Sequence, residues 1–127
     1  MVSLKAVHHV AIICSDYNRS KKFYTETLGL RILSENYRAE RNSYKLDLAL
    51  GDHYVIELFS FPNPPKRVSG PEACGLRHLA FLVDDIAAAI ANMPAITFEP
   101  IRVDEFTGKK FTFFSDPDGL PLELYEK

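Results

Sequence analysis

HVAIICSDYNRSKKFY, residues 9–24, and HLAFLVDDIAAAIANM, residues 78–93, align without a gap and indicate an internal repeat. The offset between them is 69 residues (78 − 9). A second pair, YVIELF around Glu57 and LPLELY around Glu123, repeats at an offset of 66 residues (123 − 57), so three residues are lost in a loop. Landmarks repeated in the same order indicate that the chain contains two copies of one structural module.

Each copy predicts the same order of elements, β-α-β-β-β. Apolar strand-like runs at Val7–Cys14 and Leu76–Val83 are each followed by an aspartate suited to capping a helix, Asp16 and Asp85. Three further strands are expected in each copy, at Leu30–Glu35, Ser43–Leu50, Tyr54–Phe61, Thr97–Val103, Lys110–Ser115 and Leu120–Tyr125. The fold class predicted from this pattern is α+β, with two βαβββ modules.

The domain organisation follows from the length of 127 residues, which is typical of one domain. We expect residues 1–127 to form a single domain, with module 1 at about 4–61 and module 2 at 76–127. The segment between them, 62–75, is rich in proline and glycine and is interpreted as a connector.

Composition narrows the range of partners and compartments. The formal net charge is −2 and no basic tract is present, which argues against nucleic acid or an anionic membrane as a partner. No apolar run approaches the ~18 residues of a membrane span, and the amino terminus lacks the features of a secretory signal. The two cysteines, Cys14 and Cys74, are interpreted as reduced thiols of a cytoplasmic protein.

Four polar residues interrupt otherwise apolar strands: His9, Glu57, His78 and Glu123. The glutamate follows the histidine by 48 residues (57 − 9) in one copy and 45 (123 − 78) in the other. We expect these strands to be covered on both faces, where an unpaired carboxylate costs several kcal/mol. A divalent cation held by two imidazoles and two carboxylates would neutralise both charges. Taken singly, a strand histidine is more often a hydrogen-bonded core residue, and a strand glutamate is often paired with a basic side chain.

The neighbouring histidines and cysteine are interpreted differently. His9 is the preferred ligand over His8, because His9 precedes Asp16 by the same seven residues that separate the second histidine from its aspartate. Strand alternation predicts that His8 points to the opposite face. His53 lies in a turn and is expected to be solvated, and Cys14 is expected in the core.

The combined motifs resemble the vicinal-oxygen-chelate superfamily, and glyoxalase I (lactoylglutathione lyase) within it, over nearly the whole chain. The motifs are HHVAIICSD (8–16), RSKKFYTETLGL (19–30), YVIELF (54–59), GLRHLAFLVDD (75–85) and DPDGLPLELYE (116–126). The resemblance implies paired βαβββ modules that form a curved mixed sheet around one divalent metal ion, either Ni, Co, Zn, Mn or Fe. It also implies that the metal ligands are His9, Glu57, His78 and Glu123.

The same resemblance implies a metal-dependent lyase or isomerase. Its substrate would be a small α-oxygenated carbonyl compound, or the thiol adduct of one, that loses a proton to form an enediolate. By resemblance Glu123 is the base and Glu57 the permanent ligand, although the sequence does not separate the two roles. Several basic residues could contact an anionic substrate or simply be solvated: Arg38, Arg41, Arg77, Lys109 and Lys110.

Two alternative functions remain open, and the resemblance also implies a form of assembly. The chain could sequester a small molecule without turnover, as a resistance-type metal-binding protein. It could also be a dioxygenase of the same superfamily, but that class generally uses two histidines and one glutamate on iron, so Glu57 would be an extra ligand. The resemblance implies a homodimer in which each site takes His9 and Glu57 from one chain and His78 and Glu123 from the other.

Overall fold

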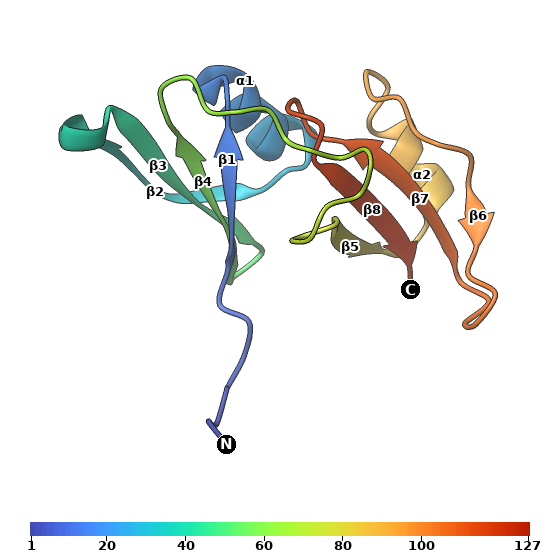
Figure 1. The fold of residues 1–127 in the computed structure, drawn as a ribbon. Helices are drawn as coiled ribbons and strands as arrows, with labels where there is room; N and C mark the ends of the chain where they lie inside the picture. The colour runs from blue at the N-terminus through green and yellow to red at the C-terminus, as the bar shows by residue number, and fades with distance from the viewer. The chain divides into compact units, whose positions relative to one another are not determined.

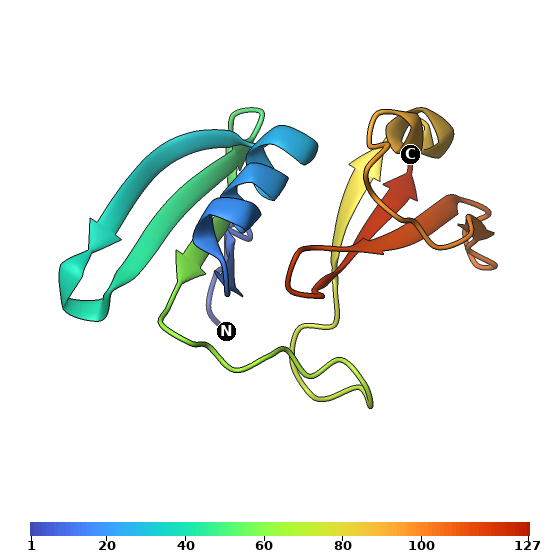
Figure 2. The ribbon, with the colours of Figure 1, turned by 90° about the horizontal axis from the view of Figure 1, so that it is seen from above.

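The computed structural model describes residues 1–127 and divides into two compact units, Met1–Pro65 and Lys66–Lys127. Each unit is a four-stranded mixed sheet with its helix packed on one face (Figures 1 and 2). This arrangement confirms the predicted α+β class and the β-α-β-β-β order of each copy. None of the helices has the length and the apolar character that crossing a membrane requires.

The first unit has the strand order β1-β4-β3-β2, in which β1 is parallel to β4 and the other neighbours are antiparallel. Its elements are β1 (Val10–Cys14), the α-helix α1 (Tyr17–Lys22), the π-helix η1 (Phe23–Thr27), β2 (Arg31–Arg38), the 3-10 helix η2 (Ala39–Arg41), β3 (Ser43–Leu50) and β4 (His53–Ser60).

The second unit repeats this topology with the strand order β5-β8-β7-β6, and β5 is parallel to β8. Its elements are β5 (Leu79–Val83), α2 (Ile86–Ala91), β6 (Arg102–Val103), β7 (Lys110–Ser115) and β8 (Pro121–Glu126).

Three predicted strands are shorter in the structure than expected. The first strand of each unit begins at Val10 and Leu79, so the site histidines lie one residue before the strand. Of the strand predicted at Thr97–Val103, only the two residues of β6 are in a strand. Pro100 has no N–H to give to a ladder, and Glu99 makes one isolated backbone bond to the carbonyl of Phe113, at 2.9 Å. Residues 97–101 therefore do not form a continuous strand with β7, although Glu99 contacts it.

The helices begin at the predicted aspartates. The carboxylate of Asp16 accepts a hydrogen bond from the N–H of Arg19, and that of Asp85 accepts one from the N–H of Ala88, both at 3.1 Å. These bonds satisfy amide groups that have no partner within the first helical turn.

Asp85→Ala is expected to lower the free energy of unfolding by about 0.5–2 kcal/mol, because the first turn of α2 loses this acceptor. Chemical denaturation followed by circular dichroism measures the change. Asp84→Ala is the matched control, because Asp84 is exposed as Asp85 is but does not occupy the capping position. Equal losses in the two variants would contradict a capping role for Asp85.

Each sheet buries one face beneath its helix. In the first unit Leu46, Leu48, Ile56 and Leu58 are fully buried on that face, and Cys14 is buried as predicted. Within each unit the opposite face is open, and there Ile13 and Leu82 are 55% and 65% exposed. The expectation that both faces are covered is therefore wrong for each unit taken by itself. The predicted histidines and glutamates lie on this open face.

Candidate functional site

In the first unit the parallel pairing of β1 with β4 brings the histidine to the glutamate. Ala11 lies directly opposite Glu57, and His9 precedes Ala11 by two residues, so His9 and Glu57 share one face of the sheet. His9 Nε2 lies 3.7 Å from Glu57 Oε1. The side chains are 33% and 16% exposed, so the pair is partly accessible from the open face.

The second unit repeats this geometry. Ala80 on β5 lies opposite Glu123 on β8, and His78 precedes Ala80 by two residues. His78 Nε2 lies 3.7 Å from Glu123 Oε1, the same separation as in the first unit. The four predicted residues are therefore brought together as two equivalent His–Glu pairs.

The donor atoms of each pair fit a divalent metal ion. A separation of 3.7 Å is too long for a hydrogen bond, but it is shorter than two metal–ligand bonds of about 2.0–2.2 Å placed end to end. Imidazole nitrogen with carboxylate oxygen suits Zn, Ni, Co, Mn or Fe. Neither unit alone gathers three or more His, Cys, Asp or Glu side chains able to hold a metal ion. Each pair thus offers two ligands.

Glu57 belongs to a polar cluster on the open face of the first sheet. Asp47 on β3 lies directly opposite Glu57, and Lys45 Nζ contacts both carboxylates, at 2.9 Å from Asp47 Oδ1 and 3.4 Å from Glu57 Oε2. The Tyr54 hydroxyl points at the same two groups, at 2.6 Å from Asp47 and 3.2 Å from Glu57. The basic partner of Glu57 therefore comes from the neighbouring strand β3 and not from β4 itself.

Hydrogen bonds within this cluster stabilise the charged forms of Lys45 and Asp47. The hydrogen bond to Asp47 raises the pKa of Lys45. Although burial opposes its charge, hydrogen bonds from Tyr54, Lys45 and Ser34 lower the pKa of Asp47. Burial, and then the hydrogen bond to Asp47, raise the pKa of the Tyr54 hydroxyl. At neutral pH Tyr54 therefore remains a neutral donor, and the ammonium of Lys45 remains charged between two carboxylates.

Glu123 has aromatic neighbours in place of this cluster. Phe113 occupies the position opposite Glu123 that Asp47 has in the first unit, and Phe111 corresponds in the same way to Lys45. The ring of His78 contacts the ring of Phe113 edge to face, at 5.0 Å between centroids. His78 is the only ionic partner of Glu123 in the chain.

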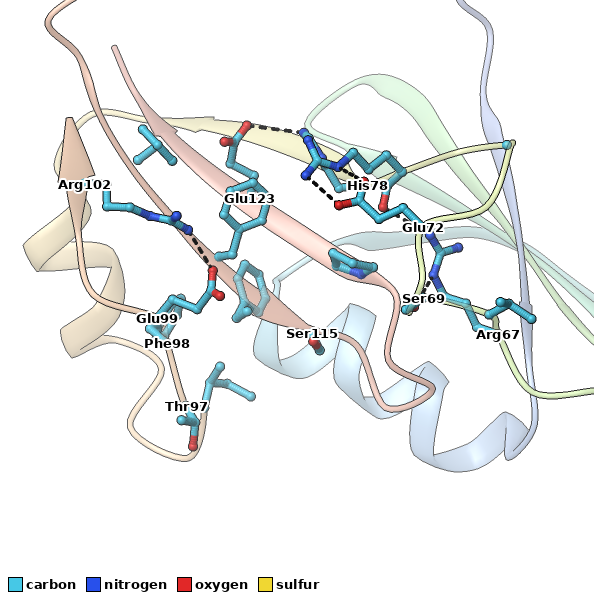
Figure 3. Close-up of a pocket in the computed structure, with 18 of the residues that line it drawn as sticks. Arg67, Ser69, Glu72, His78, Thr97, Phe98, Glu99, Arg102, Ser115 and Glu123 are labelled. Atoms are coloured by element: carbon cyan, nitrogen blue, oxygen red, sulfur yellow. Dashed lines mark hydrogen bonds and ion pairs between the residues drawn. The ribbon is translucent and has the colours of Figure 1, made fainter. Parts of the chain in front are cut away.

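His78 and Glu123 line a cavity of about 1200 Å³ within the second unit (Figure 3). Arg102 lies on the same wall, where it pairs with Glu99 at 3.0 Å and packs over Phe111 at 5.4 Å from the ring centroid. A carboxylate that shares a cavity with aromatic rings and a cation is accessible to a small polar ligand.

The structure also places the remaining histidines and the two cysteines that the sequence analysis discussed. His8 does not point to the opposite face as predicted: its Nδ1 lies 2.8 Å from His9 Nδ1, and its ring packs against Tyr54. His53 is exposed at the start of β4. Cys14 and Cys74 form no disulfide.

Among the basic residues named from the sequence, Arg77 pairs with Glu72 at 2.9 Å, and Arg38 packs over Phe59. Arg41, Lys109 and Lys110 are exposed.

Sequence reasoning missed Lys45, Asp47, Tyr54 and Arg102. One available signal was the alternation of side chains along Ser43–Leu50, since Lys45 and Asp47 are two residues apart and so share a face. Their position opposite Glu57 depends on the register between two strands, which alternation alone does not fix.

Comparison with known proteins identifies relatives over the full length of the chain. The family described as the Glyoxalase/Bleomycin resistance protein/Dioxygenase superfamily matches residues 6–124. The chain is 63% identical to the uncharacterized protein YaeR of Escherichia coli (strain K12), with 100% of both chains covered. It is also 34% identical to a probable lactoylglutathione lyase of Vibrio cholerae, over 93% of this chain and 88% of that protein.

A solved structure shares the fold. The crystal structure of the glyoxalase family protein from Enterococcus faecalis superposes with a TM-score of 0.90 at 56% identity, and covers 96% of this chain and 98% of the other. With the family match over residues 6–124, this similarity settles the classification. The chain belongs to the Glyoxalase/Bleomycin resistance protein/Dioxygenase superfamily, as the resemblance to vicinal-oxygen-chelate proteins implied.

Proposed function

We propose that this protein is a metal-dependent lyase or isomerase of the glyoxalase I type. Its substrate would be a small α-oxygenated carbonyl compound or the thiol adduct of one. The observation that carries the proposal is the repeated His–Glu pair, with the same 3.7 Å separation of nitrogen and oxygen in both units. The similarity to a probable lactoylglutathione lyase supports the same reaction class.

The residues that would hold the metal ion are His9, Glu57, His78 and Glu123. When bound, a divalent cation of this ligand type stabilises negative charge that develops on neighbouring substrate oxygens. The proton next to the carbonyl then leaves more easily, and a carboxylate within reach of that carbon accepts it.

Glu123 is the base in this proposal, and Glu57 is the retained ligand. Lys45 and Tyr54 both contact Glu57 Oε2, which leaves Oε1 toward His9. Glu123 is 14% exposed and has only the histidine as an ionic partner, so its carboxylate is free to turn toward a substrate in the cavity.

The proposal extends to assembly and location. We place each complete site in a homodimer, with His9 and Glu57 from one chain and His78 and Glu123 from the other. Such an exchange of equivalent modules is a common way to form two-fold dimers. Cys14 and Cys74 form no disulfide, which fits a reducing compartment such as the cytoplasm.

Metal binding is the first test. His78→Ala is expected to weaken binding of Zn²⁺, Ni²⁺ or Co²⁺ by at least about 100-fold, because even outer partners of metal ligands are worth about 10–100-fold. Isothermal titration of the metal-stripped protein measures the affinity and the stoichiometry. His53→Ala is the matched control and should bind as the unchanged protein does, since His53 is exposed at the start of β4. Equal affinities in all three proteins would contradict the ligand assignment.

Proton exchange is the second test and addresses the reaction itself. The metal-loaded protein should exchange the proton next to the carbonyl of α-hydroxycarbonyl compounds, or of their thiol adducts, with deuterium from the solvent. Proton NMR follows this loss of signal. Metal binding without exchange across the panel would overturn the catalytic proposal and favour a protein that sequesters small molecules.

A further inference from the structure

The two His–Glu pairs share one geometry but differ in what contacts the histidine ring. His8 Nδ1 lies 2.8 Å from His9 Nδ1, a distance at which one ring nitrogen donates and the other accepts. The two rings meet edge to face, with centroids 5.0 Å apart. The ring of Tyr54 packs against both, at 5.1 Å from His8 and 5.0 Å from His9. The imidazole of His9 is therefore held from two sides.

The direction of this hydrogen bond determines which nitrogen of His9 can bind a metal ion. If His9 Nδ1–H donates to His8, the proton of a neutral His9 ring is on Nδ1 and the lone pair is on Nε2. Nε2 is the atom that lies 3.7 Å from Glu57 Oε1. A metal-binding histidine commonly donates its other ring N–H to a nearby acceptor, which fixes the tautomer and the orientation of the ring.

The second unit lacks this contact. Arg77 precedes His78 as His8 precedes His9, but its guanidinium pairs with Glu72 at 2.9 Å. The ring of His78 instead meets the ring of Phe113 edge to face, and phenylalanine has no nitrogen or oxygen lone pair to accept an N–H. The support of the histidine is thus a property of the first unit.

We propose that His8 is a positioning residue that accepts the Nδ1–H of His9 and so presents His9 Nε2 to the metal ion. The inference rests on the proposed function, because it requires His9 to be a metal ligand. It assigns the first pair as the more preorganised of the two. His8 itself does not touch the metal ion or the substrate.

His8→Phe tests the inference, because phenylalanine keeps a ring against Tyr54 and removes the nitrogen acceptor. Zn²⁺ affinity measured by isothermal titration of the metal-stripped full-length protein is expected to fall about 10–100-fold. His8→Gln restores a carbonyl acceptor and should recover most of the affinity. Arg77→Phe makes the same change at the equivalent position of the second unit, and its Zn²⁺ affinity should equal that of the unchanged protein.

The tautomer of His9 gives a readout that a purely structural role would not change. Long-range ¹H–¹⁵N correlation spectra of the metal-free protein are expected to show the His9 proton on Nδ1, and to show a shift toward Nε2 in His8→Phe. Amide spectra of the same samples report whether the variant is folded.

The outcomes separate this inference from the proposed function. Unchanged Zn²⁺ affinity in His8→Phe, or a proton on His9 Nε2 in the unchanged protein, overturns the role of His8 and leaves the metal site intact. Equal losses in His8→Phe and Arg77→Phe also overturn it, because the effect would then not depend on the contact with His9. Failure of the unchanged protein to bind Zn²⁺, Ni²⁺ or Co²⁺ overturns the proposed function and this inference together.

Discussion

Glu123→Gln is expected to slow proton exchange next to the substrate carbonyl by about 100- to 10,000-fold, the range that a positioned general base contributes. Glutamine has nearly the shape of glutamate and keeps an oxygen that can contact a metal ion, but it cannot accept the proton. Metal affinity should therefore fall much less than the exchange rate. The measurement compares deuterium incorporation with isothermal titration on the same preparation.

Glu57→Gln is the matched variant in the first unit. It should slow exchange less than Glu123→Gln does, because Glu57 Oε2 is occupied by Lys45 and Tyr54 and this carboxylate is assigned as the retained ligand. A greater loss in Glu57→Gln would reverse the two roles. Unchanged exchange in Glu123→Gln with the metal ion retained would refute the base assignment.

Leu58→Ala is expected to lower the free energy of unfolding by about 2–5 kcal/mol, the usual cost of truncating a fully buried leucine. Leu58 has no exposed surface and lies between Ile12 on β1 and Leu46 on β3 in the first sheet. A cavity at this point removes contacts on both sides of β4, the strand that carries Glu57. Urea denaturation followed by circular dichroism measures the loss.

Leu50→Ala is the control for this prediction. Leu50 lies at the end of β3 and is 48% exposed, so its truncation should change stability by no more than about 0.5 kcal/mol. A loss below about 1 kcal/mol in Leu58→Ala would contradict the core position of that side chain.

Much of the fold was predictable because the sequence contains two copies of the same pattern of strands and helix. Both helix-capping aspartates, the strands Ser43–Leu50 and Lys110–Ser115 and the α+β order follow from local patterns, and the structure confirms them. The π-helix η1 did not follow from the pattern. There the hydroxyl of Thr25 donates to the carbonyl of Lys21 at 2.7 Å, a bond that competes with the regular backbone ladder.

The candidate site was predictable in its residues and less so in its surroundings. The repeat identifies the two histidines and two glutamates, and the structure joins them as pairs. Alternation failed for His8, because His8 lies two residues before the first residue of β1 and the pleat of the strand does not fix its direction. It could not reveal Lys45 as a partner of Glu57, because contacts across strands depend on register.

The lateral pairing of parallel strands has a consequence for how this protein can vary. The histidine and glutamate of each pair are neighbours because β1 lies beside β4 and β5 beside β8 in the same alignment, although 48 (57 − 9) and 45 (123 − 78) residues separate them along the chain. Insertions or deletions in the intervening hairpins therefore leave the geometry of each His–Glu pair unchanged, whereas a slip of one residue between the paired strands turns the glutamate away from its histidine. The hairpins can thus change in length while the two His–Glu pairs keep their geometry.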